Sequence, residues 1–168
     1  MRTIYTKRLR IRPLQKKDQA SLVDLFTDPT VKKTYMLPDF TSRQEAEKLF
    51  LRLMALSAEP ERFIMALCLE DTCIGILHET EVTEQSVELG YAVLPAYRNR
   101  GYCTEALQGA IKYLLDRGCR QILAGAFEEN SASIRVMEKC GMERISKTEE
   151  IPYRGRVHTC VYYRKEGK

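Results

Sequence analysis

The chain has 168 residues and a mass of 19.4 kDa, a length typical of one folded domain. Hydrophobic residues make up 44% of it and charged residues 30%, which excludes a disordered, collagen-like or low-complexity chain. No apolar run approaches the ~18 residues that span a bilayer, and the N-terminal residues contain no hydrophobic signal core. We therefore expect one domain over residues 1–168 that is cytoplasmic and has no membrane partner.

The charge and the cysteines exclude further classes. With 27 basic and 23 acidic residues the net charge is +4, too mild to indicate nucleic acid, and we expect the basic residues between Lys7 and Lys17 to lie on a solvated edge strand. The six cysteines form no CxxC pair and show no zinc-ligand spacing with the two histidines. We expect reduced thiols, no metal and no cysteine nucleophile, because no activating neighbour is evident.

The first third of the chain predicts a strand and then helices. Residues 4–12 alternate between apolar and basic side chains, and Pro13 ends this strand. A helix with apolar residues at helical spacing follows Asp18, a candidate N-cap. Asp28 and Pro29 interrupt it, and a short second helix is expected through Val31.

A third helix begins after Thr41 or Ser42, where Glu45 completes a capping box. Beyond it the chain turns to extended segments separated by polar turns, which indicates an antiparallel meander. The three strands span residues 63–69, 73–82 and 87–94.

The second half of the chain alternates between helices and strands. One apolar stripe over residues 103–115 predicts a helix ended by Gly118, and a strand over 121–127 follows. Strand, helix and strand at this spacing favour a parallel pair. A helix over 130–140 and two strands flanking residues 154–155 complete an α/β fold. We expect a mixed, mostly antiparallel twisted sheet of six or seven strands with helices on both faces.

The segment between the third meander strand and the next helix stands out for its chemistry. Backbone N–H groups at a helix N-terminus have no intrahelical partner, and Gly101 lets a ligand approach them. Arg98 and Arg100 add positive charge suited to a diphosphate. The alternative is a helix-start turn with solvated arginines. No Walker loop or three-glycine Rossmann turn is present in the sequence.

Arg98-x-x-Gly101-x-Cys103 resembles the Gln/Arg-x-x-Gly-x-Gly/Ala pyrophosphate signature of the GNAT N-acetyltransferase superfamily. Cys103 departs from it, since Gly or Ala is usual there. Four ordered motifs are similar to the RimJ/RimL branch, which contains protein N-terminal acetyltransferases. They are Thr6–Arg12, Glu88–Tyr91, Gly101–Ala106 and Asn130–Ser133.

The resemblance implies acetyl-CoA as co-substrate, with its pantetheine arm between the splayed strands 87–94 and 121–127. Unpaired amides of diverging strands can bond the amide-rich arm as another strand would, and Pro95 marks where pairing stops. The expected acetyl-CoA contacts are Tyr91, Val93, Leu94, Arg98, Asn99, Arg100, Gly101, Tyr102, Cys103, Asn130 and Ser133.

Transfer to an amine requires a base, an oxyanion donor and a proton for the departing sulfur. We expect the oxyanion donor to be the N–H of Val93 or Leu94. Glu88 is the first candidate base, because a carboxylate on a central strand is costly unless it is hydrogen-bonded or lines a cleft. The alternative for Glu88 is a solvated or paired strand carboxylate.

Two further catalytic candidates follow from the resemblance. Glu150, like its neighbour Glu149, lies where RimL-type relatives use a glutamate, with a solvated strand end as the alternative. Many relatives place a tyrosine acid where this chain has Met137, and Ser133 is the expected substitute. Its hydroxyl could bond the sulfur, or it could satisfy a backbone group, just as Asn130 could bind pantetheine or only cap its helix.

The acceptor is expected to be a primary amine, either a protein N-terminus or a small molecule. An open cleft favours a peptide, and a closed pocket with carboxylates favours a small cation. The competing hypothesis is an acyl-CoA-binding module without turnover. Nucleic acid is not expected as a partner, and the sequence is compatible with a monomer or a homodimer.

Overall fold

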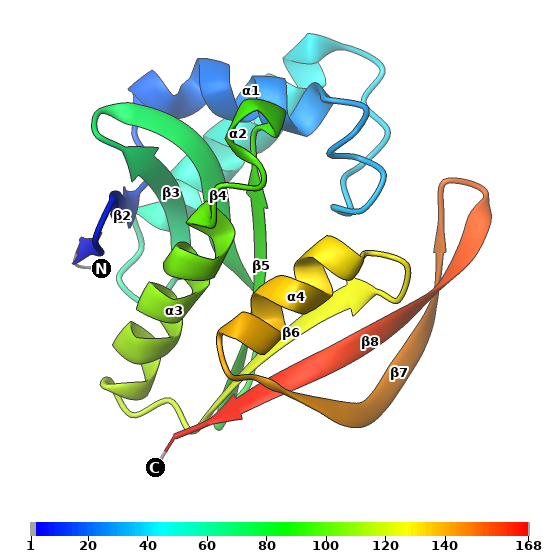
Figure 1. The fold of residues 1–168 in the computed structure, drawn as a ribbon. Coiled ribbons are helices and arrows are strands. Elements are labelled where there is room, and N and C mark those ends of the chain that lie inside the picture. Colours follow the sequence, from blue (N-terminus) through cyan, green and yellow to red (C-terminus); the bar gives the residue numbers. More distant parts are fainter. Residues whose placement is uncertain (1–2, 168) are drawn as a thin grey trace.

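Residues 3–167 are described by a computed structural model, and they form a twisted eight-stranded sheet with helices on both faces (Figure 1). The strands are β1 (Ile4–Tyr5), β2 (Leu9–Pro13), β3 (Ile64–Leu69), β4 (Thr72–Val82), β5 (Ser86–Val93), β6 (Gln121–Phe127), β7 (Glu143–Tyr153) and β8 (Arg156–Glu166). The helices are α1 (Gln19–Thr27), α2 (Arg43–Ser57), α3 (Tyr102–Leu115) and α4 (Ser131–Lys139), with short 3-10 turns η1 (Lys16–Asp18) and η2 (Pro95–Tyr97).

The strand order is β1-β2-β3-β4-β5-β6-β8-β7, and in the described part of the chain β5–β6 is the one parallel pairing. The predicted meander and the parallel pair are therefore confirmed. No helix within residues 3–167 is long and apolar enough to cross a membrane.

Two predicted elements in the N-terminal third were wrong. The predicted first strand is interrupted at Thr6, whose N–H donates to the Leu9 carbonyl, so that β1 folds back on β2 and the sheet gains an eighth strand. The expected short helix before Val31 is a turn. Asp28 accepts hydrogen bonds from the N–H groups of Thr30 and Val31, and this side-chain capping competes with helical backbone bonds.

The basic N-terminal residues are not a solvated edge, because β2 pairs with both β1 and β3. Arg12 is buried and forms a bidentate pair with Asp18 at 2.8 Å for both bonds. The Asp18 carboxylate therefore binds Arg12 instead of capping α1. Arg10 pairs with Asp71, so its charge, like that of Arg12, is neutralised within the protein.

Side chains alternate between two cores along β5. Leu89 and Val93 pack with α3 in one core, whereas Ala92 packs against α1 and α2 in the other. Figure 1 shows the corresponding layers, with α3 and α4 on one side of the sheet and α1 and α2 on the other. A ligand that contacts both sets of side chains must therefore pass through the sheet.

Candidate active site

The sheet opens where β5 and β6 diverge. Their pairing runs only from Ser86↔Gln121 to Glu88↔Leu123 within the described residues, and Figure 1 shows the two strands separating beyond that point. A cleft of about 710 Å³ occupies this region. Tyr91 and Val93 line it from the α3 side and Glu88 from the α1 side, so the cleft joins the two faces of the sheet.

The open edge of β5 presents main-chain groups to this cleft. The Leu94 N–H donates to the Ile74 carbonyl at 2.8 Å on the neighbouring strand β4. Because bonding alternates along an antiparallel pair, the N–H groups of Tyr91 and Val93 point away from β4, toward the gap. Of the two expected oxyanion donors, Leu94 is thus already bonded within the sheet and Val93 has a free direction.

The loop after η2 delivers further N–H groups. Asn99 and Gly101 adopt left-handed conformations with φ of 59° and 78°, and Gly101 caps α3 without a side chain. In the part of the chain that is described, the N–H groups of Gly101, Tyr102 and Cys103 meet no hydrogen-bond acceptor. Three uncapped donors at a helix N-terminus form an anion-binding cradle.

Arg98 and Arg100 were both expected to add positive charge at the diphosphate, but they lie in different places relative to the cleft. The Arg98 N–H is bonded to the Pro95 carbonyl, and its guanidinium lines the cleft and donates to the Thr30 hydroxyl at 3.0 Å. Arg100 and Asn99 are exposed, and of these two Asn99 lines the cleft. Arg98 is therefore the loop cation best placed for a phosphate.

Arg8, to which the sequence assigned no role, holds this loop. Its Nε pairs with Glu105 Oε2 at 2.6 Å, and one of its terminal nitrogens donates to the Arg100 carbonyl at 3.0 Å. The guanidinium also covers the ring of Tyr102, 4.6 Å from its centroid. The arginine-rich start of the chain thus fixes the loop conformation through side-chain contacts that span more than ninety residues.

The N-terminus of α4 forms the opposite wall of the cleft. Asn130 caps the helix, its Oδ1 accepting from the Ser133 N–H at 3.2 Å. The Ser133 hydroxyl lies 2.9 Å from the Tyr91 hydroxyl, so it contacts a side chain that lines the cleft. Burial raises the pKa of Tyr91, which remains a protonated donor at neutral pH. Arg135 and Lys139, one helical turn apart, also line this wall and were not anticipated.

Cys103 lines the cleft beside the cradle but is not activated. Burial raises its pKa to about 11, and the nearby Arg98 charge offsets this only in part. The residue is therefore a neutral thiol at physiological pH, and a neutral thiol is a poor nucleophile.

The α1 side of the cleft carries a single carboxylate. Among the described residues that line the cleft, Glu88 is the one acidic side chain, and it accepts a hydrogen bond from the Thr80 hydroxyl at 2.8 Å. Glu79 instead accepts from the Phe63 N–H and pairs with Arg62. Within residues 3–167, Glu88 is thus the one carboxylate positioned to meet a cationic acceptor.

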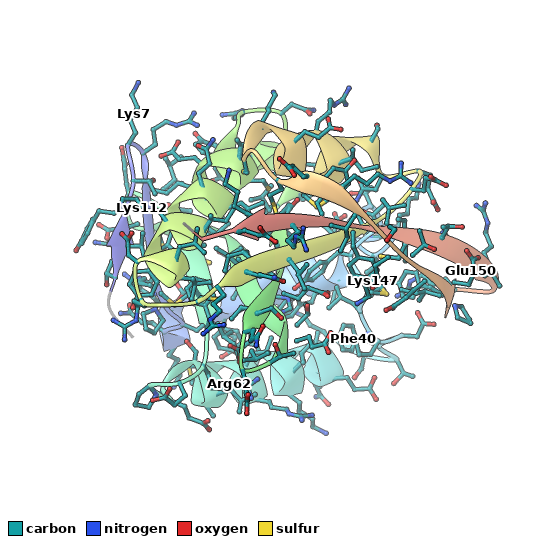
Figure 2. All side chains as sticks on the ribbon, turned by 90° about the horizontal axis from the view of Figure 1, so that it is seen from below. Lys7, Phe40, Arg62, Lys112, Lys147 and Glu150 are labelled. Atoms are coloured by element: carbon teal, nitrogen blue, oxygen red, sulfur yellow. The ribbon has the colours of Figure 1, made fainter. Side chains whose placement is uncertain are left out.

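Glu150 does not reach the cleft. Its side chain is exposed and accepts from the Thr159 hydroxyl across the β7–β8 hairpin. Figure 2 shows it toward the projecting end of that hairpin, beyond Lys147. Its neighbour Glu149 accepts from the hydroxyl of Tyr162, which does line the cleft. The resemblance that pointed to Glu150 therefore selected a residue outside the cleft.

Two cleft residues went unnoticed in the sequence, Tyr35 and His78. The Tyr35 hydroxyl lies 2.5 Å from His78 Nε2, and His78 Nδ1 lies 2.9 Å from the Glu79 carbonyl oxygen. Their rings meet edge to face with centroids 5.9 Å apart. They come from segments 43 residues apart, so no local pattern could have connected them.

The family of the chain follows from comparison with known proteins. Residues 8–143 match the family model described as the acetyltransferase (GNAT) domain. The chain belongs to the GNAT acetyltransferase family. This acetyltransferase is 34% identical over 143 residues to the uncharacterized N-acetyltransferase YnaD of Bacillus subtilis, covering 84% of this chain and 82% of that protein.

Solved structures extend the likeness across the whole acetyltransferase. A GNAT-family acetyltransferase from Bacillus anthracis superposes with a TM-score of 0.85 at 26% identity, covering 98% of both chains. RimL, a ribosomal L7/L12 α-N-protein acetyltransferase solved with coenzyme A, gives a TM-score of 0.87 at 16% identity, covering 99% of this chain and 98% of its own. The second likeness concerns the fold. Acetyl-CoA is the co-substrate that the family and the free N–H cradle of α3 both support.

Proposed function

We propose that this protein transfers the acetyl group of acetyl-CoA to a primary amine that carries one positive charge, first of all the α-amine of a peptide or protein. The observation that carries the proposal is the single carboxylate, Glu88, on the α1 side of the cleft in the described chain. A peptide N-terminus presents one ammonium group beside neutral amides, whereas a polyamine presents several charges and calls for several carboxylates.

The chain's own groups divide the work along the cleft. The N–H groups of residues 101–103 and the Arg98 guanidinium are proposed to hold the diphosphate, with the Tyr91 and Val93 main chain beside the pantetheine. The Val93 N–H stabilises negative charge that develops on the acetyl oxygen. Acetyl-CoA supplies the thioester, whose thiol leaving group has a free pKa of about 8.5.

The two remaining polar groups flank the reaction centre from opposite faces. Glu88 binds the acceptor ammonium on the α1 side. On the α3 side Ser133, hydrogen-bonded to Tyr91, donates a proton toward the departing sulfur. The fold of RimL, which acts on a protein N-terminus, supports the peptide as the first acceptor to test.

The test is an acceptor panel read by mass spectrometry. It contains peptides with free N-termini, the same peptides with formylated N-termini and an internal lysine, spermidine, an amino sugar and free amino acids. We expect acetylation on the α-amine of the free peptides and none on their blocked counterparts. Spermidine acetylated faster than every peptide would contradict the proposed acceptor. A silent panel with intact coenzyme A binding would favour the binding module.

A further inference from the structure

We propose that Tyr35 and His78 form a proton-accepting pair that deprotonates the acceptor ammonium, a role separate from the electrostatic role of Glu88. The inference rests on the proposed function, because it assigns the base of that same reaction. It stands on three observations: the hydrogen-bonding direction within the pair, its position in the cleft, and the charges around it.

The hydrogen-bonding direction follows from the backbone. The Glu79 carbonyl oxygen can only accept, so His78 Nδ1, 2.9 Å away, carries the imidazole proton. His78 Nε2 then has a free lone pair, and the Tyr35 hydroxyl at 2.5 Å donates to it. The tyrosine oxygen keeps lone pairs of its own that can accept a proton from a ligand. The pair is thus oriented to carry a proton from the cleft to the imidazole.

The position of the pair is on the acceptor side of the cleft. His78 lies opposite Gly90 across the β4–β5 pairing, and both Tyr35 and His78 line the same cleft as Glu88. Gly90 makes room for the ring, because a Cβ there would lie 3.2 Å from His78 Nε2. Glu88 precedes Gly90 by two residues on the same face of β5. The pair and the carboxylate therefore meet one ligand.

Burial keeps the imidazole neutral against the charges around it. Burial lowers the pKa of His78, and the Glu79 hydrogen bond and charge oppose this shift. The Glu79 carboxylate is itself paired with Arg62, and the β5 carboxylate Glu88 is bonded to Thr80. From β3 the register partner is Ile64, and α1 and α2 bring apolar side chains to this face. An uncharged imidazole at neutral pH is ready to accept a proton.

Protons and electron pairs balance in the proposed step. One ammonium N–H bond breaks and its proton goes to the Tyr35 oxygen, while the Tyr35 hydroxyl proton moves to His78 Nε2. The amine lone pair forms the C–N bond with the acetyl carbon, and the C–S bond breaks with its electron pair remaining on sulfur. The second nitrogen proton goes to the thiolate through Ser133, and the imidazolium returns its proton to water.

The test compares pH profiles of kcat/KM for Tyr35→Phe and His78→Gln with those of the wild type, using the best peptide of the acceptor panel. We expect each variant to lose about a hundredfold in kcat at neutral pH with an unchanged Kd for coenzyme A. The wild-type profile falls at acid pH as His78 becomes protonated, below its ordinary value of about 6.5. The profiles of the variants lack this fall at the His78 pKa. Their kcat/KM instead rises with pH up to the pKa of the acceptor amine, because the variants react only with the neutral amine.

Tyr163→Phe is the matched control. Its hydroxyl donates to Glu138 Oε1 at 3.4 Å, and the residue neither contacts the pair nor lines the cleft. We expect lower thermal stability and a wild-type pH profile. A second measurement is the NMR chemical shifts of the His78 ring nitrogens. They should show the Nδ1-protonated form and a pKa below the ordinary histidine value. An ordinary His78 pKa would overturn the proposed role of the pair and leave the proposed function standing. So would pH profiles of both variants that keep the wild-type fall at acid pH. A protein that acetylates no amine overturns both.

Discussion

The two ends of the cleft are built differently. At the coenzyme A end, a short continuous segment supplies main-chain donors, with Gly101 opening the approach and α3 supplying the helix N-terminus. At the acceptor end, side chains converge from the α1–α2 segment, β4, β5 and β8. A diphosphate is the same in every reaction of this kind and is recognised by backbone, whereas the acceptor is recognised by side chains that differ in type and origin.

Gly101→Val should have the largest effect, a loss of acetyl-CoA binding at the coenzyme A end of the cleft. A Cβ at this left-handed position strains the backbone and lies 3.4 Å from an Arg8 guanidinium nitrogen, beside the donors of the cradle. Loss of the diphosphate contacts should raise the Kd for acetyl-CoA by about a hundredfold, equivalent to about 2.7 kcal/mol. Isothermal titration calorimetry measures it directly.

Gly118→Val is the control for strain alone. Gly118 has a φ of 92°, a Cβ added to it would meet no atom within 4 Å, and it does not line the cleft. Both variants should lose about 1–3 kcal/mol of folding free energy from the left-handed backbone. Equal acetyl-CoA affinity for the two variants would show that the cradle does not bind the diphosphate.

Glu88→Gln should weaken the acceptor end while leaving the coenzyme A end intact. We expect kcat/KM for a cationic amine to fall by about thirtyfold with unchanged coenzyme A affinity, since one charge-assisted contact contributes about 1.5–3 kcal/mol. Glu150→Gln is the matched carboxylate outside the cleft and should stay within about twofold of wild type. A larger loss for Glu150→Gln than for Glu88→Gln would restore the sequence-based assignment of Glu150.

The contrast between the two ends also explains what the sequence could predict. The cradle was readable because its donors, its glycine and its helix lie within a few consecutive residues. The succession of helices and strands along the chain was readable from hydrophobic period and turn residues, with the errors at Thr6 and Asp28 caused by local hydrogen bonds that override periodicity.

The acceptor end was not readable for a physical reason. Tyr35 contacts His78 across 43 residues, through side-chain geometry that no spacing encodes. The same limit applies at the coenzyme A end to Arg8, which contacts Arg100 across 92 residues. The resemblance pointed to Glu150, which lies on β7 toward the projecting end of the β7–β8 hairpin and outside the cleft (Figure 2). Glu88 was found from the sequence because a carboxylate on a central strand is costly unless it is hydrogen-bonded or lines a cleft.

Tyr91→Phe and Ser133→Ala should show the smallest effect on kcat. They test the contact between the two hydroxyls where the two ends of the cleft meet. Each removes one hydroxyl of the 2.9 Å contact, so we expect about a tenfold loss in kcat with little change in coenzyme A affinity. Because the two hydroxyls act together, the double variant should be no slower than the more impaired single variant. Fully additive losses in steady-state kinetics would show that they act independently.

A crystal structure with coenzyme A tests the central claim most directly. The account predicts the diphosphate over the N–H groups of Gly101, Tyr102 and Cys103, and the pantetheine arm along Tyr91 and Val93 in the opening between β5 and β6. Density in a separate cavity beyond the end of α3, lined in part by Leu115, Gly118 and Gln121, would contradict it, as would a diphosphate distant from those three nitrogens.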